Sequence, residues 1–529
     1  MKKLLTISLA ILLTMAFCFG YASQTKAGSG MDERLETAKL EIKNKISQIK
    51  TDVPIASQGA IHICADETWS GIHHITSDVF IDSGSTLTIM PGTQVIFDGL
   101  FSLVVAGKLV ANGTASQLIT FTHNTPPSNY RGISCIPDSN LELTYCNIDY
   151  AGADLGGSTY SPGLAIEGSG SVQNCTFSHS ALINIFILNN SDVSISYSDF
   201  LNDTLLGIGV IEDAVPTLSG NNMQSSMAAI LLDQNSASRI SSNNFGPSTI
   251  ASIYCEDDTK PNINDNYFIG GGLGGLAVMA SGSTQLEITG NEVIDYFGGI
   301  SLDENVSATI KNNNIKDNIY SGIYIRENTT ATINYNSIYN NNTDNDPSGG
   351  GISLADNAGA TVNYNDISTN KQYGINNQTT GPTTINAVKN YWGAASGPTH
   401  PSNPGGTGDA VTDNVTFNPW LDASYTTPPS VGSVNLTDGQ TVSGVYTIVA
   451  DSSWVVHGSP QEDITKVDFY IDGELKGSDT TYPYTYDWDT TGYHSPHAVR
   501  IVVTNILGNT DEKSYNVNVI SELPYTGKM

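Results

Sequence analysis

The sequence has 529 residues, of which 39% are hydrophobic, only 14% are charged and 51 are glycine, and its formal net charge is −30. This length is enough for one large core and a smaller domain. The negative charge argues against nucleic acid as a partner, because binding to phosphates requires a cationic surface. An acidic surface suits divalent cations or neutral glycans, or serves solubility alone.

The first 22 residues have the pattern of a secretory signal peptide. Two lysines precede an apolar run from Leu4 to Phe19, and small residues mark a cleavage site near Ala22. No later apolar run approaches the roughly 20 residues of a membrane-spanning helix. We therefore expect a secreted or cell-surface protein with no membrane span in its mature chain.

The segment 23–59 contains an expected amphipathic helix at 31–50. Its apolar residues recur at helical spacing: Leu35, Ala38, Ile42, Ile46 and Ile49. A helix of this length is marginal alone, so it must pack on something. We expect it to cover an open end of the repeats described next, or to serve as an oligomerisation helix.

A repeat of about 22–23 residues occupies most of the chain. It is clearest in GGISLDEN at 298–305, SGIYIREN at 321–328 and GGISLADN at 350–357. The repeat can be followed towards the N-terminus, because each unit has an apolar residue at the end of an Asn-rich turn. Ten units carry this residue: Ile148, Phe177, Phe200, Met223, Phe245, Phe268, Val293, Ile315, Ile338 and Ile367. Fixed-period repeats indicate a solenoid, and the short alternating apolar runs within each unit indicate strands. Such units must stack to bury their apolar faces, which predicts a parallel β-helix.

Stacking places equivalent residues about 4.8 Å apart on successive coils. Asn313, Asn336 and Asn365 are then expected to form a structural amide ladder within the turns. Cys146 and Cys175 share a coil position, so their Cα atoms come within disulfide reach. The sequence leaves open a disulfide or a pair of buried thiols.

Three segments of the repeat region are characteristic: STLTIMPGTQVIFDG followed by LVVAGKLVANGT near the start, and NYWGAASGP at 390–398 near the end. On these segments, residues 60–421 resemble secreted bacterial right-handed parallel β-helix proteins of the pectin-lyase-like superfamily. The resemblance implies the right-handed β-helix fold. It does not define an activity, because this superfamily includes lyases, glycosidases, epimerases, adhesins and inert surface proteins.

After an expected linker at 422–430, residues 431–520 change to alternating strands with turns every 8–12 residues, as in a β-sandwich. The elements VDFYIDG and YPYTYDWDT resemble bacterial Ig-like modules. A tail at 521–529 contains LPYTG, which we interpret as a chance match to a sortase signal. The expected fold is therefore all-β: a short N-terminal helix, a β-helix and an Ig-like sandwich.

One outward face of the coils gathers the candidate functional residues. Alignment of the repeats predicts that acidic residues, an arginine and two tyrosines share this exposed face: Asp233, Glu256, Asp303, Arg326, Tyr254 and Tyr324. Tyrosine rings stack on sugars, and carboxylates can act as acid and base or bind calcium. The resemblance to lyases further implies that Arg326 could act as a base. Substrate binding is thus assigned to Tyr254, Tyr324 and Asp233, and catalysis to Asp303, Arg326 and Glu256.

Each of these assignments has a structural alternative. Asp303 and Arg326 one coil apart can be only a cross-strand ion pair. Possible calcium ligands are Glu256, Asp257 and Asp258 in one cluster and Asp344 and Asp346 in a loop, but acidic turn residues explain both nearly as well.

Three functions remain open. The first, which we favour because catalytic motifs are incomplete, is non-catalytic binding or adhesion to extracellular polysaccharide. The second is a calcium-assisted polysaccharide lyase or glycoside hydrolase acting on the outer face. The third is a structural or self-assembling surface protein, with residues 31–50 or the Ig-like module as contact elements.

Overall fold

The computed structural model describes residues 35–37, 39–41, 43–44, 47–49, 59–126, 128–156, 159–201, 205–224, 227–272, 274–381, 383–494 and 496–520. The predicted signal peptide and C-terminal tail lie outside these residues. The chain divides into two compact units. One comprises Met1–Thr361, Thr369–Thr384 and Thr412–Asn414, and the other Val362–Ser368, Ile385–Val411 and Val415–Met529.

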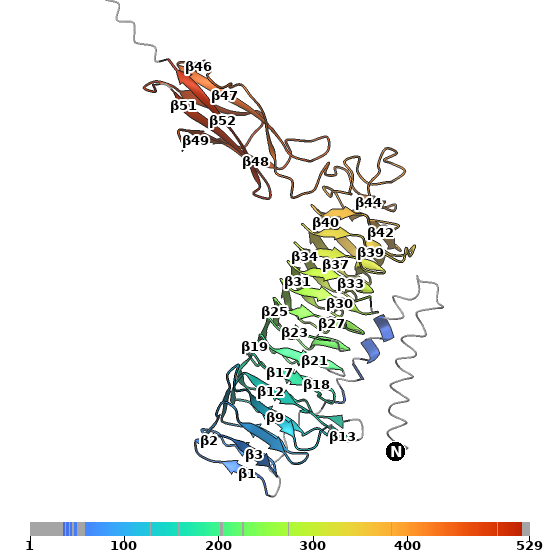
Figure 1. The fold of residues 1–529 in the computed structure, drawn as a ribbon. Helices are drawn as coiled ribbons and strands as arrows, with labels where there is room; N and C mark the ends of the chain where they lie inside the picture. Colours follow the sequence, from blue (N-terminus) through green and yellow to red (C-terminus); the bar gives the residue numbers. More distant parts are fainter. Residues whose placement is uncertain are drawn as a thin grey trace, which may run out of the picture. The chain divides into compact units, whose positions relative to one another are not determined.

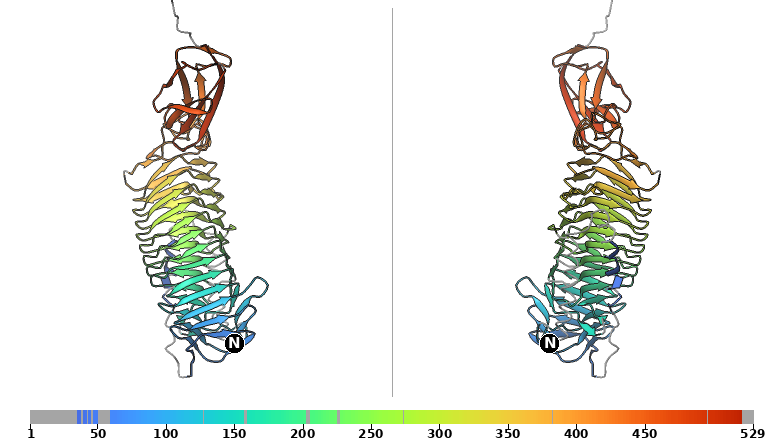
Figure 2. Two further views of the ribbon diagram at one scale, coloured as in Figure 1. Left: turned by 90° about the vertical axis from the view of Figure 1, so that its left-hand side faces the viewer. Right: turned by 90° about the vertical axis from the view of Figure 1, so that its right-hand side faces the viewer.

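The predicted parallel β-helix is confirmed. Each coil contributes one strand to each of three long sheets, as β33 (Gly298–Leu302), β34 (Ser307–Lys311) and β35 (Asn314–Lys316) do. A 14-stranded sheet runs from β1 (Ile61–Ile63) to β42 (Ile375–Thr379). The second and third sheets have 15 and 13 strands, and the stacked coils are visible in Figures 1 and 2.

The interior of the solenoid is apolar because side chains alternate along each strand. In β33, Ile300 and Leu302 are buried and pair with Ile323 and Ile325 of β36 (Ser321–Ile325) on the next coil. Aromatic rings also stack between coils: the ring centroids of Phe245 and Phe268 lie 4.6 Å apart. The coils therefore stabilise one another through identical contacts repeated along the axis.

The predicted asparagine ladder is present and longer than expected. Within the solenoid unit it runs through Asn221, Asn243, Asn266, Asn291, Asn313 and Asn336, all buried. Each Oδ1 accepts the backbone N–H of the previous rung, as Asn313 does for Asn291 at 2.8 Å. Each side-chain amide also donates to the next Oδ1, which satisfies polar groups inside the turn.

Cys146 and Cys175 occupy the same turn position on earlier coils. Both are buried free thiols, so the disulfide alternative is not formed in this structure. The Cys175 sulfur accepts the N–H of Cys146 at 3.4 Å, and Ser198 Oγ accepts the N–H of Cys175 at 3.1 Å. The thiol of Cys175 and the hydroxyl of Ser198 thus accept the backbone N–H groups that asparagines accept from Asn221 onwards.

The N-terminal helix is confirmed, but its expected position at an end of the solenoid is wrong. Helical residues at 35–37, 39–41 and 43–44 lie along the outer face of the 14-stranded sheet, beside β27 (Ala251–Cys255) in Figure 1. After the helix, Ile49 forms a parallel bridge with Tyr160 of β14 (Thr159–Tyr160). We call the described residues of this segment, 35–37, 39–41, 43–44 and 47–49, the N-terminal strap.

The C-terminal module is a two-sheet structure, as predicted. One sheet has the order β45-β47-β50 and the other β46-β52-β51-β48-β49, from β45 (Ser430–Val434) to β52 (Thr510–Val519). Trp488, Phe469 and Ile501 are among the residues of its buried core. At the start of the expected linker 422–430, the Asp422 N–H donates to Val455 O at 2.7 Å within this unit.

Candidate functional site

Strand pairing gathers the predicted residues on the outer face of the 14-stranded sheet. Tyr254 pairs with Met279 of β30 (Leu276–Ala280), Met279 with Ser301, and Ser301 with Tyr324. The repeat alignment that groups Glu256 with Asp303 places Met279 in the same column, on the coil between them. That register is wrong by two residues on this coil, because the pairing of Leu276 with Gly298 puts the equivalent of Gly299 two residues after Gly275.

The acidic column lies just beyond the strand ends. Glu256, Asp303 and Arg326 each follow the last residue of β27, β33 and β36, and Ser281 lies on the coil between Glu256 and Asp303. Arg326 Nη2 donates to Asp303 Oδ2 at 2.6 Å. Asp303 and Arg326 are therefore in contact on adjacent coils, as predicted.

The expected exposure of this face is wrong. The relative exposures are 0% for Tyr254, 5% for Tyr324, 3% for Glu256, 1% for Asp303 and 5% for Arg326. The physical reason is that the strap lies on the face. Leu35 is itself only 2% exposed and shares one apolar cluster with Tyr254, Met279 and Tyr324.

Three charged side chains of the strap pair with charges of the sheet face. Lys39 Nζ donates to Asp303 Oδ2 at 2.5 Å and to Glu304 Oε1 at 2.6 Å. Glu36 Oε1 accepts from Arg326 Nη2 at 2.5 Å, and Lys43 Nζ lies 2.7 Å from Glu256 Oε1. The strap therefore supplies a counter-charge to each of the three residues assigned to catalysis.

These contacts favour the charged forms of the strap residues. Burial alone would lower the pKa of Lys39, but hydrogen bonds to Asp303 and Glu304 outweigh it and raise that pKa. Burial alone would raise the pKa of Glu36, but Arg326 and Lys39 bring it below its usual range. Asp233, which lies on an earlier coil, has its pKa raised to about 6, chiefly by burial.

Two carboxylates retain unused hydrogen-bonding capacity. Asp303 Oδ1 and Glu256 Oε2 are buried and have no hydrogen-bond partner in the part of the chain that the structure describes. Burial raises the pKa of the Tyr254 phenol, so this group stays protonated at neutral pH. The face therefore holds paired charges and buried tyrosine rings.

Among the predicted calcium ligands, Glu256, Asp257 and Asp258 do not form a described group of three carboxylates close enough to share one ion. Calcium binding by this cluster remains a prediction. Among the described residues, Glu36, Asp303 and Glu304 form a carboxylate group whose oxygens lie within 4.8 Å of one another, and Lys39 already lies between Asp303 and Glu304. Asp257 and Asp258 have φ values of 45° and 61°, as residues of tight turns do.

The second predicted calcium loop is held by its own hydrogen bonds. Asp346 Oδ1 accepts from both the N–H and the hydroxyl of Ser348, at 2.7 and 2.8 Å. The side-chain amide of Asn342 donates to the backbone oxygen of Asp346 at 2.7 Å. This arrangement has the geometry of a capped turn. Calcium binding at Asp344 and Asp346 remains a prediction.

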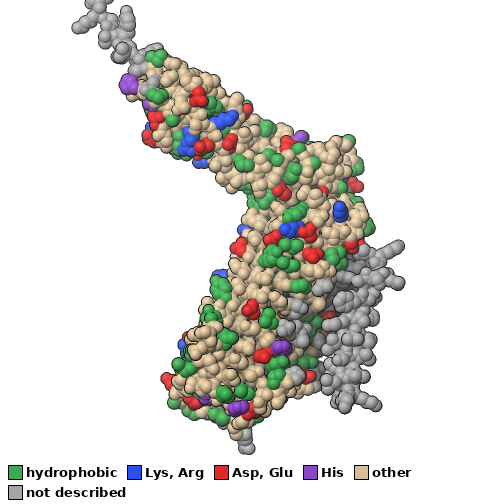
Figure 3. Space-filling view, viewed as in Figure 1, with side chains coloured by type: hydrophobic (Ala, Val, Ile, Leu, Met, Phe, Trp, Pro, Cys, Tyr) green, Lys and Arg blue, Asp and Glu red, His purple; other side chains and the backbone are tan. Residues whose placement is uncertain are grey.

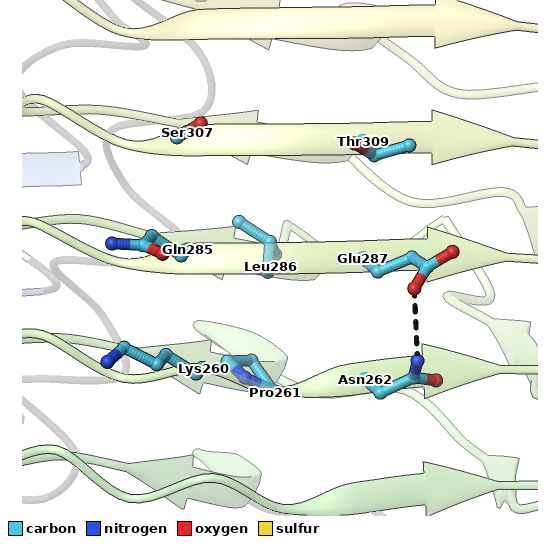
Figure 4. A pocket seen from close by; sticks show the side chains of 8 residues that line it. All are labelled: Lys260, Pro261, Asn262, Gln285, Leu286, Glu287, Ser307 and Thr309. Carbon is cyan, nitrogen blue, oxygen red and sulfur yellow. Dashed lines mark hydrogen bonds between the residues drawn. The ribbon is translucent and has the colours of Figure 1, made fainter.

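A shallow groove of about 360 Å³ lies on the outer face of the 15-stranded sheet. Figure 4 shows its lining on three successive strands: Lys260, Pro261 and Asn262; Gln285, Leu286 and Glu287; and Ser307 and Thr309. Asn262 Nδ2 donates to Glu287 Oε2 at 3.2 Å, and Lys311 forms an ion pair with Glu287 at 2.5 Å. The Lys311 hydrogen bond lowers the pKa of Glu287, which keeps it ionised.

The groove belongs to a longer polar column. Outward residues on successive strands of this sheet pair in register, and none of them is buried: Ser194, Thr217, Arg239, Asn262, Glu287, Thr309 and Thr332. Each coil thus offers one hydrogen-bonding side chain about 4.8 Å from the next. In Figure 3, uncharged surface predominates, with charged side chains scattered over it.

Two families match the sequence. Residues 162–307 and 295–390 match the family described as right handed beta helix region, and residues 429–519 match the bacterial Ig domain. No curated protein matches the chain. These matches agree with the fold, a right-handed β-helix followed by a C-terminal module that matches the bacterial Ig domain.

The solved structures that match this chain share little sequence with it. The A-module of a mannuronan C-5 epimerase from Azotobacter vinelandii is 14% identical with a TM-score of 0.36, and the match covers 64% of this chain and 91% of that one. An Escherichia coli bacteriophage tailspike in complex with a hexasaccharide is 12% identical with a TM-score of 0.31, covering 93% and 90%. Fibronectin(III)-like modules of Clostridium thermocellum CbhA are 22% identical with a TM-score of 0.14, covering 17% and 94%.

The described residues contain no helix that is both long enough and apolar enough to span a membrane.

Sequence reasoning missed Glu36, Lys39 and Lys43 as parts of this site. A signal was available, because Leu35, Lys39 and Lys43 recur at four-residue spacing and so share one face of the helix. A second signal was the apolar outward side chains Phe186, Leu231 and Met279, all buried in the structure, since such side chains on a sheet face need a cover.

Proposed function

We propose that this protein is an exported, non-catalytic binder of extracellular polysaccharide, and that the polysaccharide lies along the outer face of the 15-stranded sheet. The observation that carries the proposal is the in-register polar column through Asn262 and Glu287, in which no side chain is buried. A chain of sugars with a repeat close to the coil spacing would meet one hydrogen-bonding side chain per coil.

The chemistry of the groove favours a neutral or weakly charged glycan. Amide and hydroxyl groups of Asn262, Gln285 and Thr309 can both donate and accept hydrogen bonds, as sugar hydroxyls do. The charges of Glu287 and Lys311 neutralise each other. A strongly anionic polymer would gain little here in a protein of net charge −30.

The test is retention of the purified full chain on a panel of neutral and acidic polysaccharides in affinity gel electrophoresis. We expect retention on at least one neutral glycan, and its loss in Asn262→Ala with Gln285→Ala. The matched control is Asn222→Ala with Asn244→Ala, an amide pair on the 13-stranded sheet. Absence of retention on every glycan, or equal loss in both double variants, would contradict the proposal.

A second candidate is a polysaccharide lyase or hydrolase that uses the strap-covered face. It is favoured by the convergence of Glu256, Asp303, Arg326 and two tyrosines on one surface. Calcium could contribute only where a cation replaced Lys39 between Asp303 and Glu304. The test follows reducing ends and the ultraviolet absorbance of unsaturated products, in wild type and in variants that disrupt the strap.

A further inference from the structure

We propose that the N-terminal strap is a displaceable cover, which leaves the 14-stranded sheet while the solenoid stays folded. Its release exposes an acidic face that contains Tyr254 and Tyr324. This inference concerns a different sheet from the proposed polysaccharide face and does not depend on that proposal.

The ion pairs that hold the strap are only partly shielded from water. Relative exposures of the side chains are 58% for Glu36, 57% for Lys43 and 41% for Glu304, although their partners Arg326 and Glu256 are nearly buried. Ion pairs that include an exposed member contribute little free energy and weaken with salt. Lys39 is the exception, because its side chain is 7% exposed. The closed state therefore depends mainly on Lys39 and on the apolar contact of Leu35.

The sheet beneath the strap is complete without it. Parallel pairing connects β24 (Ala228–Leu232), β27, β30, β33 and β36, and the Arg326–Asp303 ion pair lies entirely within the sheet. The contacts described between the helical part of the strap and this sheet are made by side chains. Departure of the helix would therefore break no strand pairing.

One end of the strap has backbone bonds to the solenoid. Ile49 bridges Tyr160, and the Tyr160 N–H donates to Gln48 O at 3.0 Å. Tyr160 belongs to a small hairpin of β13 (Asp154–Gly156) and β14, in a longer coil. The strap is thus attached by backbone at 48–49 and by side chains at 35–43, which is the arrangement of a hinged cover.

Charge indicates what the uncovered face would attract. When the strap leaves, Lys39 and Lys43 leave with it. The carboxylates of Glu256, Asp303 and Glu304 then keep one cation among their described contacts, which is Arg326. The face would therefore select a basic helical segment with the same chemistry as the strap, an apolar residue followed by lysines at four-residue intervals.

The experiment is tyrosine nitration of the full-length protein, read residue by residue by mass spectrometry. In wild type we expect Tyr254 and Tyr324 to be protected, and exposed Tyr197, at 64% relative exposure, to react. Lys39→Glu with Lys43→Glu should raise nitration of Tyr254 and Tyr324 by about tenfold or more, as a shift of about 1.4 kcal/mol or more in opening would produce. Buried Tyr296, whose hydroxyl lies 2.8 Å from that of Ser252, should stay protected.

A charge exchange tests the specificity of the contact. Lys43→Glu alone should increase nitration of Tyr254, and adding Glu256→Lys should restore protection by re-forming the pair with reversed signs. The proposal is overturned if the Lys39→Glu, Lys43→Glu variant protects Tyr254 as well as wild type does. It is also overturned if Tyr254 and Tyr296 become reactive together, because the strap would then leave only when the solenoid unfolds.

Discussion

Lys39 Nζ lies 2.5 Å from Asp303 Oδ2, although the two residues are 264 positions apart in the sequence. This contact places a cation from the N-terminal helix on the central carboxylate of the candidate site. It explains why the most chemically suggestive face of the solenoid is closed to solvent in this structure.

Replacing Lys39 with methionine should destabilise the fold. Asp303 would keep Arg326 but lose its second cation, and Glu304 would lose its partner. A buried charged group deprived of a hydrogen-bond partner typically costs about 1–3 kcal/mol, which we expect as the loss in free energy of unfolding. Urea titration measures this loss. Lys108→Met, which removes a half-exposed surface pair with Glu142, is the control and should cost less than about 1 kcal/mol. Equal losses in the two variants would mean that the Lys39 contact is no stronger than a surface pair.

Replacing Asn291 with alanine should interrupt the ladder at its centre. Asn291 Oδ1 accepts the N–H of Asn266, and its amide donates to Asn313 Oδ1 at 3.0 Å and to Ile263 O at 2.9 Å. Because each buried group left unpaired costs about 1–3 kcal/mol, we expect a loss of about 3 kcal/mol or more in chemical unfolding. Exposed Asn244→Ala should stay within about 0.5 kcal/mol of wild type. A small effect of Asn291→Ala would imply that water replaces the rung.

The free energy of unfolding should depend on pH through Asp233. Burial raises the pKa of this carboxyl to about 6, above its usual value of about 3.9. The folded state therefore binds the proton more tightly, and this contribution is fully present below about pH 4 and is lost as pH rises through 6. Between pH 4 and 7.5, wild type should lose more stability than Asp233→Asn, which cannot ionise. The free energy of unfolding is measured by urea titration at each pH. If it depends on pH equally in both proteins, Asp233 is not the group responsible.

Thiol labelling should distinguish the two states of the cysteine pair. Iodoacetamide under native conditions is expected to modify exposed Cys64 but not Cys146 or Cys175. In denaturant without reductant, both buried thiols should react, as the structure has them free. If they react only after reduction, the disulfide allowed by their stacking has formed in the purified protein.

Most of the architecture could be predicted from local patterns. The glycine and asparagine spacing defined the coils, and the alternation in segments such as SGIYIREN distinguished interior Ile323 and Ile325 from outward Tyr324. Because these patterns repeat from coil to coil, the assignment of strands in one coil supports the assignment in the next coil. The register failed at Met279, because two added residues after Gly275 shifted the outward column by two places.

The burial of the candidate site could not be predicted from local patterns. Whether Asp303 and Arg326 are exposed depends on a helix nearly 300 residues away, and neither local periodicity nor coil spacing reports such a contact. The helix itself was predictable, but an amphipathic pattern does not say which surface it will meet. The matching of Lys39 and Lys43 with the acidic column, and the apolar side chains beside that column, could have indicated the partner surface.

In a solenoid, each coil contacts only the coils beside it, so stability adds from neighbour to neighbour and the stack can open at its weakest interface. The N-terminal strap changes this rule, because it joins the coil of Tyr160 to the coils of Glu256, Asp303 and Arg326. The strap therefore connects coils that are not neighbours. When force is applied along the solenoid axis with the strap bound, we expect this part of the β-helix to unfold in one step. With the strap released, we expect the coils to unfold one after another.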